Sequence, residues 1–258
     1  MPLLPLPALA LPDTGTILLV TIAFAVAGGV KGVVGLGLPT ISAAVMASVI
    51  DLRTAVGILI VPLLVTNLWQ VLQVGGVGVL LRRFGALNLA AGVGLWIGTE
   101  ILFTVDPRWM QLGLGTLLVL NAGLQVFGGM PVVPRSHEAR LSVPVGLVSG
   151  LVGGMTGSQG IVIAVYLASL NLTRDEYVQG VGLSFFLTGI VWAAAIASNG
   201  GITTQTLPLS VLALAVALAA MALGTRLRRH LPQARFRQAV FVAMALIGAN
   251  LIRRAIMG

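Results

Sequence analysis

The fold is decided by the stretch Lys31-Gly32-Val33-Val34-Gly35-Leu36-Gly37-Leu38-Pro39, which interrupts an apolar run that extends from residue 14 to residue 50. Closely spaced glycines followed by a proline break a helix, because glycine admits conformations that a helix lacks and proline lacks an N–H group. A second apolar run, residues 142–172, is interrupted in the same way by Gly150-Leu151-Val152-Gly153-Gly154-Met155-Thr156-Gly157-Ser158-Gln159-Gly160. The sequence therefore predicts two broken helical segments, one in each half of the chain.

The composition around these segments is that of a membrane protein. Of the 258 residues, 57% are hydrophobic and only 9% are charged, and the mean hydropathy is +1.04. A soluble domain cannot cover its surface with so few charges, whereas lipid tolerates an apolar surface. The 33 glycines fit as well, since small residues let helices approach closely in a bilayer. We predict an all-α polytopic membrane protein with about eight membrane segments.

The charged and metal-binding residue types narrow the function. The formal net charge is +8, but most arginines fall between apolar runs. They are better interpreted as topology determinants that meet anionic lipid headgroups than as a nucleic-acid surface. The chain has no cysteine, and His137 and His230 both lie among arginines in polar stretches. We therefore expect no disulfide, no metal site and no cofactor.

Apolar runs bounded by charge, proline or glycine pairs define the other segments. Further spans are predicted at residues 54–74, 84–105, 108–127, 176–198, 206–225 and 236–252. Residues 1–13 hold four prolines and no lysine or arginine, which is unlike a signal peptide, and form a lead-in. A polar connector at 128–141 then separates a first repeat, residues 14–127, from a second, residues 142–258.

The length of the second broken segment predicts its topology. Residues 142–172 are too many for one upright span and too few for two full spans of about 20 residues each. Two short helices that meet at the glycine break would enter the membrane and return to the same side. Arginines at 82–83, 135–140 and 226–237 place those loops in the cytoplasm, and the N-terminus in the periplasm. The pair Arg253-Arg254 then falls outside, against this rule.

The two halves resemble each other. A shift of 122 residues superposes the glycines at 28, 32 and 35 on those at 150, 154 and 157. Because the two broken segments would enter from opposite sides, the repeat would be inverted, with one re-entrant hairpin and three spans in each half. Broken helices at matching positions of inverted repeats mark the substrate site of many transporters.

Together with Gln179-Gly180-Val181-Gly182-Leu183-Ser184-Phe185, the two glycine motifs resemble the TauE/SafE family of membrane permeases. The resemblance covers nearly the whole chain in length and segment order. It implies a multi-pass permease of the bacterial inner membrane that handles sulfite, organosulfonates or related small anions. Members often carry three glycines and then a proline in the second motif, whereas here Ser158 and Gln159 stand between the glycines and no proline follows. This departure leaves the substrate open.

The broken segments are the candidate substrate site. Unwound backbone inside a membrane normally lines a cavity, and a half-helix that starts there directs free N–H groups and a positive dipole end at it. These features make an anion site. The candidate residues of the breaks are Gly32, Gly35, Gly37, Gly157 and Gly160. The alternative is that these glycines serve only close helix packing.

Polar side chains in the breaks have two interpretations each. Lys31, the only lysine, is either a counter-charge for the anion or reaches out to the headgroups. Thr156, Ser158 and Gln159 either donate hydrogen bonds to the anion or cap the half-helix.

Further polar residues lie inside the predicted spans. Asn67, Gln70, Asn121 and Thr188 could line the pathway, although each alone more often holds helices together. Glu100 could carry a coupling proton, or it is an interfacial carboxylate.

The sequence favours a secondary transporter that moves a small anion by alternating access. Membrane lipids and a second copy of the chain, as a homodimer, are the other expected partners. An anion channel is the main alternative, since short re-entrant hairpins serve channels as well. An intramembrane enzyme is disfavoured because the sequence shows no HExxH motif and no paired acidic residues inside a span.

Overall fold

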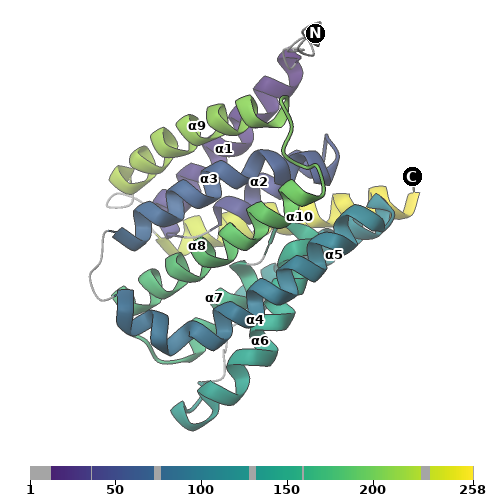
Figure 1. Ribbon diagram of the computed structural model, residues 1–258. Coiled ribbons are helices and arrows are strands. Elements are labelled where there is room, and N and C mark those ends of the chain that lie inside the picture. The colour runs from purple at the N-terminus through teal and green to yellow at the C-terminus, as the bar shows by residue number, and fades with distance from the viewer. Residues whose placement is uncertain are drawn as a thin grey trace, which may run out of the picture.

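The computed structural model describes residues 13–35, 37–72, 77–127, 132–158, 160–227 and 233–257, and this part of the chain is helical without strands (Figure 1). The helices are α1 (Thr14–Val34), α2 (Leu38–Ala47), α3 (Leu52–Leu72), α4 (Val77–Thr104), α5 (Pro107–Phe127), α6 (Arg135–Thr156), α7 (Gly160–Ser169), α8 (Arg174–Ser198), α9 (Thr206–Leu227) and α10 (Gln233–Met257). The prediction of an all-α chain is confirmed.

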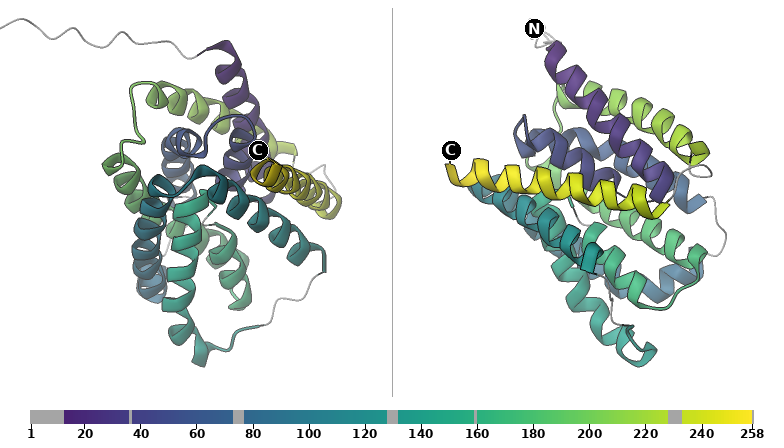
Figure 2. Two further views of the ribbon diagram at one scale, coloured as in Figure 1. Left: turned by 90° about the vertical axis from the view of Figure 1, so that its right-hand side faces the viewer. Right: turned by 180° about the vertical axis from the view of Figure 1, so that it is seen from behind.

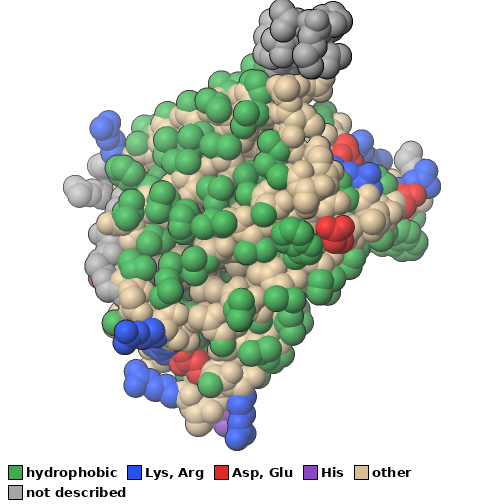
Figure 3. Space-filling model, viewed as in Figure 1, with side chains coloured by type: hydrophobic (Ala, Val, Ile, Leu, Met, Phe, Trp, Pro, Cys, Tyr) green, Lys and Arg blue, Asp and Glu red, His purple; other side chains and the backbone are tan. Residues whose placement is uncertain are grey.

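Within the described residues, seven helices are long and apolar enough to cross a bilayer, namely α1, α3, α4, α6, α8, α9 and α10. The helices α2 and α7 have ten residues each and are too short to cross. Figure 3 shows hydrophobic side chains over the broad middle of one face, with the charged side chains gathered near its margins. The chain is therefore a polytopic membrane protein, as its composition predicts.

Each broken segment returns to the end of the molecule at which it starts. Asp13, before α1, and Ile50, after α2, line the same surface hollow. In the second half, the Tyr166 hydroxyl near the end of α7 donates a hydrogen bond of 2.8 Å to the carbonyl O of Glu138, near the start of α6. We call these two ends the N-terminal end and the connector end. The predicted re-entrant course is thus present in both halves.

The arms of the hairpins differ from the prediction in length. The first arms, α1 and α6, have 21 and 22 residues, whereas two short helices were expected. The helix α6 starts at Arg135, inside the predicted connector 128–141, after Pro134 in an extended conformation. Polar residues continue this helix out of the apolar zone, and Glu138 in its first turn complements the helix dipole. Its carboxylate also pairs with Arg83 of α4 at 2.7 Å.

Glycines end the first arms at equivalent positions. The helix α1 ends at Gly35 with φ 90°, and α6 ends at Gly157 with φ 73°. Both conformations are left-handed and favour glycine. Gly37, with φ 103°, then starts α2. The shared 122-residue spacing of the sequence therefore corresponds to the same helix ending in the two halves.

Two pairs of parallel helices each combine one helix of the first half with one of the second. The helix α1 packs along α9, as α6 packs along α4 (Figures 1 and 2). A Cβ atom on Gly28 would meet the carbonyl O of Ala217, and one on Gly150 would meet the carbonyl O of Ala91. The next contacts follow the same relation: Gly32 approaches Met221, and Gly154 approaches Leu95. The glycine helices are related by a shift of 122 residues (150 − 28) and their partners by a shift of 126 residues (217 − 91). The two pairs are therefore equivalent, contact by contact.

The halves are inverted relative to each other. The helices α3 and α8 hold equivalent places in the two halves and pack antiparallel, since Gly182 approaches Gln70 and Gly189 approaches Leu63. The helices α5 and α10 are likewise antiparallel, side by side in both views of Figure 2. Equivalent helices that run in opposite directions require a two-fold axis across them. This is the geometry of an inverted repeat.

The helix α3 contains a proline that another helix compensates. Pro62 lacks the N–H group that would bond the carbonyl O of Ile58. The hydroxyl of Ser210, from α9, donates to that oxygen at 2.6 Å. The open carbonyl of α3 is thereby satisfied inside the core, two turns before Thr66 and Asn67.

Candidate functional site

A cavity of about 450 Å³ lies between the two broken segments. Gly37 of the first break and Gly160 of the second both line it, together with residues of α1, α5, α8 and α10. From the breaks it extends toward the connector end, where Ala168 and Tyr177 lie near the ends of α7 and α8. Both halves of the chain therefore contribute to one hollow, as the repeat predicts.

Two helices start at this cavity. The first hydrogen bond within α2 runs from the Ile41 N–H to the carbonyl O of Gly37, at 2.9 Å. The N–H groups of the first turn precede that bond and have no place in the helix's own ladder. The helix α7 starts at Gly160, also in the lining. The partial positive charge of two helix starts thus falls on the same space.

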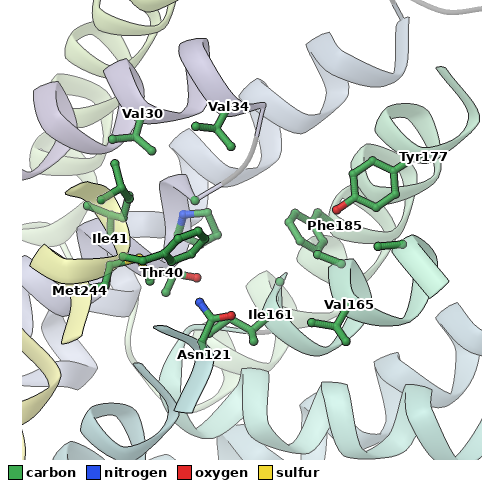
Figure 4. Close-up of a pocket in the computed structure, with 17 residues that line it drawn as sticks. Val30, Val34, Thr40, Ile41, Asn121, Ile161, Val165, Tyr177, Phe185 and Met244 are labelled. Carbon is green, nitrogen blue, oxygen red and sulfur yellow. The ribbon is translucent and has the colours of Figure 1, made fainter. Parts of the chain in front are cut away.

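Three polar side chains point into the cavity (Figure 4). Thr40 and Asn121 are 4% and 6% exposed, and Tyr177 lies opposite them on α8. Within the described residues, none of these three side chains makes a hydrogen bond to the protein. Buried polar groups normally have partners, so these donors are available to a ligand. With the helix starts they form a set of donors suited to an anion.

The second break is packed closed on its far side. Gly157 lies against Ala43 of α2, Val56 of α3 and Trp192 of α8. The Ser158 hydroxyl is fully buried and finds no hydrogen-bond partner within the described residues. Thr156, the last residue of α6, accepts a hydrogen bond of 3.2 Å from the Ser158 N–H, within the break. Gln159 lies outside the described residues.

A second hollow, of about 550 Å³, lies at the N-terminal end. Arg53, Thr54 and Thr203 are among its lining residues. Most of α2 is buried and belongs to the hydrophobic core that also holds Trp192 and Ile196 of α8. The two hollows thus lie at opposite ends, and packed core residues of α2 separate them.

Lys31 lies elsewhere than predicted. It belongs to the last turn of α1 rather than to the break, and is 5% exposed. Its Nζ donates to the Asn67 Oδ1 at 2.6 Å and to the Thr66 Oγ1 at 3.2 Å. The side chain therefore points toward α3 and is absent from the cavity lining. The alternative that it reaches the headgroups is wrong, because the amine is buried.

The other predicted site residues make contacts between or within helices, outside the cavity lining. Gln70 Nε2 donates to the carbonyl O of Val178 at 3.0 Å, and Thr188 bonds within its own helix. Gly32 packs against the backbone of α9. Glu100 accepts a hydrogen bond of 2.9 Å from the Asn199 amide, next to the N-terminal end. Of the predicted set, Gly37, Gly160 and Asn121 line the cavity. Gly35 does not line it but directly follows Val34, which does.

Sequence reasoning missed Thr40 and Tyr177. Thr40 is the third residue of α2, and the first turn of a half-helix that starts at a break faces the same space as the break. Counting from Gly37 would have found it. No comparable sequence signal marks Tyr177, because it lies in a predicted span away from both glycine motifs.

Comparison with known proteins identifies a family. The family model described as Sulfite exporter TauE/SafE matches residues 20–251. The match begins inside α1 and ends inside α10, so it includes both breaks and all helices that line the cavity. No curated protein and no solved structure matches this chain.

Proposed function

Because the chain belongs to the TauE/SafE sulfite exporter family, a family of membrane transporters, we propose that it carries a small anion through the cavity between α2 and α7. The anion is sulfite, an organosulfonate or a related organic acid. The protein works in the bacterial inner membrane, with the connector end in the cytoplasm and the N-terminal end in the periplasm. The charge distribution supports this orientation, since Arg83, Arg135, Arg140 and Arg226 belong to the connector end.

The observation that carries the proposal is the donor set in the cavity. A sulfonate or sulfite head offers three oxygens that accept hydrogen bonds. The Thr40 hydroxyl, the Asn121 amide and the N–H groups at the starts of α2 and α7 are donors on several sides of one space. A hydrogen bond to a charged group contributes about 1.5–3 kcal/mol, so a few of them hold an anion without a salt bridge.

The rest of the lining favours an organic anion over bare sulfite. Val30, Val34, Phe185 and Met244 give the cavity mostly apolar walls. Ligand sites of this size combine apolar walls with a few polar groups that fix orientation. A sulfonate with a short hydrocarbon chain would place its head at the helix starts and its chain against these walls.

The positions of the two hollows support alternating access. The cavity extends to the connector end, while buried residues of α2 close the path to the hollow at the N-terminal end. A channel would need a continuous path between the two. An inverted repeat provides the second state, in which the halves exchange conformations and the N-terminal end opens.

Ligand-induced thermal stabilisation of the purified protein in detergent tests this proposal. Sulfite, ethanesulfonate, thiosulfate, acetate and phosphate are compared on the wild type and on T40V and N121L. T99V is the matched control, because it is the same substitution at a threonine whose hydroxyl bonds within α4, away from the cavity. We expect ethanesulfonate to stabilise the wild type and T99V, with affinity about tenfold weaker or more in T40V and N121L. Equal affinity for ethanesulfonate in all variants would show that the anion does not bind in this cavity.

A further inference from the structure

The buried amine of Lys31 is held by hydrogen bonds to two side chains of α3. Among the described residues, its Nζ hydrogen-bonds to neutral oxygens alone, at 2.6 Å from Asn67 and 3.2 Å from Thr66. Both partners lie one turn beyond Pro62 on α3, and both are fully buried. An ionisable group at this depth is costly and normally has a function.

The two partners are oriented as acceptors. The Thr66 hydroxyl donates its own proton to the carbonyl O of Pro62 at 2.7 Å. The Asn67 amide Nδ2 donates to the carbonyl O of Leu63 at 2.9 Å, which turns its oxygen toward Lys31. The site can therefore receive N–H groups of an amine in its neutral or its charged form.

No carboxylate lies near enough in the fold to balance a charge here. The sequences of α1, α2, α3, α9 and α10, which surround Lys31, contain no aspartate or glutamate. Apart from Lys31, the charged residues of these helices are Arg53, Arg226, Arg235, Arg237, Arg253 and Arg254, all near helix ends. On α8, packed behind α3, Asp175 and Glu176 stand at the connector end, and on α4 Glu100 bonds Asn199. A buried ammonium without a counter-ion is expensive unless an anion arrives.

The cavity can supply that anion. Val30 and Val34, one residue before and three residues after Lys31 on α1, both line it. An anion held there lies next to the helix turn that carries the amine, so its charge acts on the buried Lys31. The charge of Lys31 and the occupancy of the cavity are therefore linked.

We propose that Lys31 is the protonation site that couples transport of the anion to transport of a proton. The neutral amine binds one proton, R–NH₂ + H⁺ → R–NH₃⁺, when an anion enters the cavity, and the ammonium releases it when the anion leaves. The proton comes from water on the side where the cavity is open and goes to water on the other side. Anion and proton thus move in the same direction, and a monoanion moves without net charge. This inference rests on the function proposed above.

The repeat limits the coupling to one proton. The 122-residue shift pairs Lys31 with Gly153 and Asn67 with Gly189, whereas Thr66 pairs with Thr188. The hydroxyl is present in both halves and bonds its own helix in both. The amine and the amide exist only in the first half, so a second copy of the site is absent from the described residues.

Calorimetric titration with ethanesulfonate, in two buffers that differ in ionisation enthalpy, counts the protons taken up on binding. Tris and imidazole are suitable, because neither is an anion that competes for the cavity. Ethanesulfonate stays a monoanion between pH 6.5 and pH 8.5, so protons taken up belong to the protein. We expect uptake to approach about one proton per anion in the wild type as pH rises. K31M and K31R should take up none, and K31R, with its permanent charge, should still bind.

Glu100 provides the matched control. E100Q should take up protons as the wild type does. The inference is overturned if the wild type binds ethanesulfonate with the same heat in both buffers across this range. It is also overturned if K31R keeps the uptake, or if E100Q loses it. If neither ethanesulfonate nor another anion of the panel binds the wild type, the function proposed above fails instead.

Discussion

Single side chains in this fold complete bonds that the backbone of another helix leaves open. Ser210 of α9 donates to the carbonyl O of Ile58, which Pro62 leaves without a partner. In S210A this buried oxygen would lose its donor, at a cost of about 1–3 kcal/mol. Thermal unfolding in detergent should show a lower midpoint for S210A. S198A, at an exposed serine that bonds its own helix, should stay within about 0.5 kcal/mol of the wild type. Equal midpoints for the two variants would contradict this role of Ser210.

At the same scale, the sequence identified several residues of interest, but it did not predict the direction of their side chains. Lys31 stood out because a lone amine in an apolar run is costly to bury. Its partners, Thr66 and Asn67, come from another helix, and the way α1 turns against α3 cannot be read from spacing. The donors that face the cavity were only partly identified for the same reason. Asn121 was predicted, whereas Thr40 was not.

At the scale of helices, glycine decides which surfaces meet. Gly98 and Gly85 both belong to α4, but a Cβ on Gly98 would collide with the carbonyl O of Leu151 on α6. A Cβ on Gly85 would meet nothing within 4 Å. We expect G98A to destabilise the protein by about 1–3 kcal/mol through overpacking, and G85A to be neutral or stabilising by up to about 1 kcal/mol. Thermal unfolding of both variants under identical conditions checks this. Loss of stability in G85A alone would refute the assignment.

Helix ends were the least predictable feature at this scale. The breaks after α1 and α6 follow from glycines that adopt left-handed conformations. The start of α6 does not follow from hydropathy, because polar residues from Arg135 onward continue the helix beyond the apolar zone. Arg254, one of the two arginines that violated the expected charge bias, also has a local role. Arg254 donates to the carbonyl O of Ser48 and so caps the end of α2.

At the scale of the whole molecule, the two hollows predict accessibility from opposite sides. The chain contains no cysteine, so single cysteines report cleanly. Ala168 is exposed in the cavity, and Thr203 is exposed in the hollow at the N-terminal end. A membrane-impermeant maleimide should modify T203C in intact cells, and A168C only in inside-out vesicles. A213C, at a fully buried position, should react in neither preparation. Modification of A168C in intact cells would reverse the proposed orientation or the open end.

The glycine-lined pairs have a consequence for the two halves considered apart from each other. Within the described residues, α1 packs closely along α9 and α6 along α4, so each half lends its broken helix to the other. A five-helix polypeptide equivalent to one half would leave the glycine face of its first helix uncovered. Two copies would cover each other's faces only if they inserted into the membrane in opposite orientations. The close α1–α9 and α6–α4 contacts therefore require both halves in one membrane, in opposite orientations.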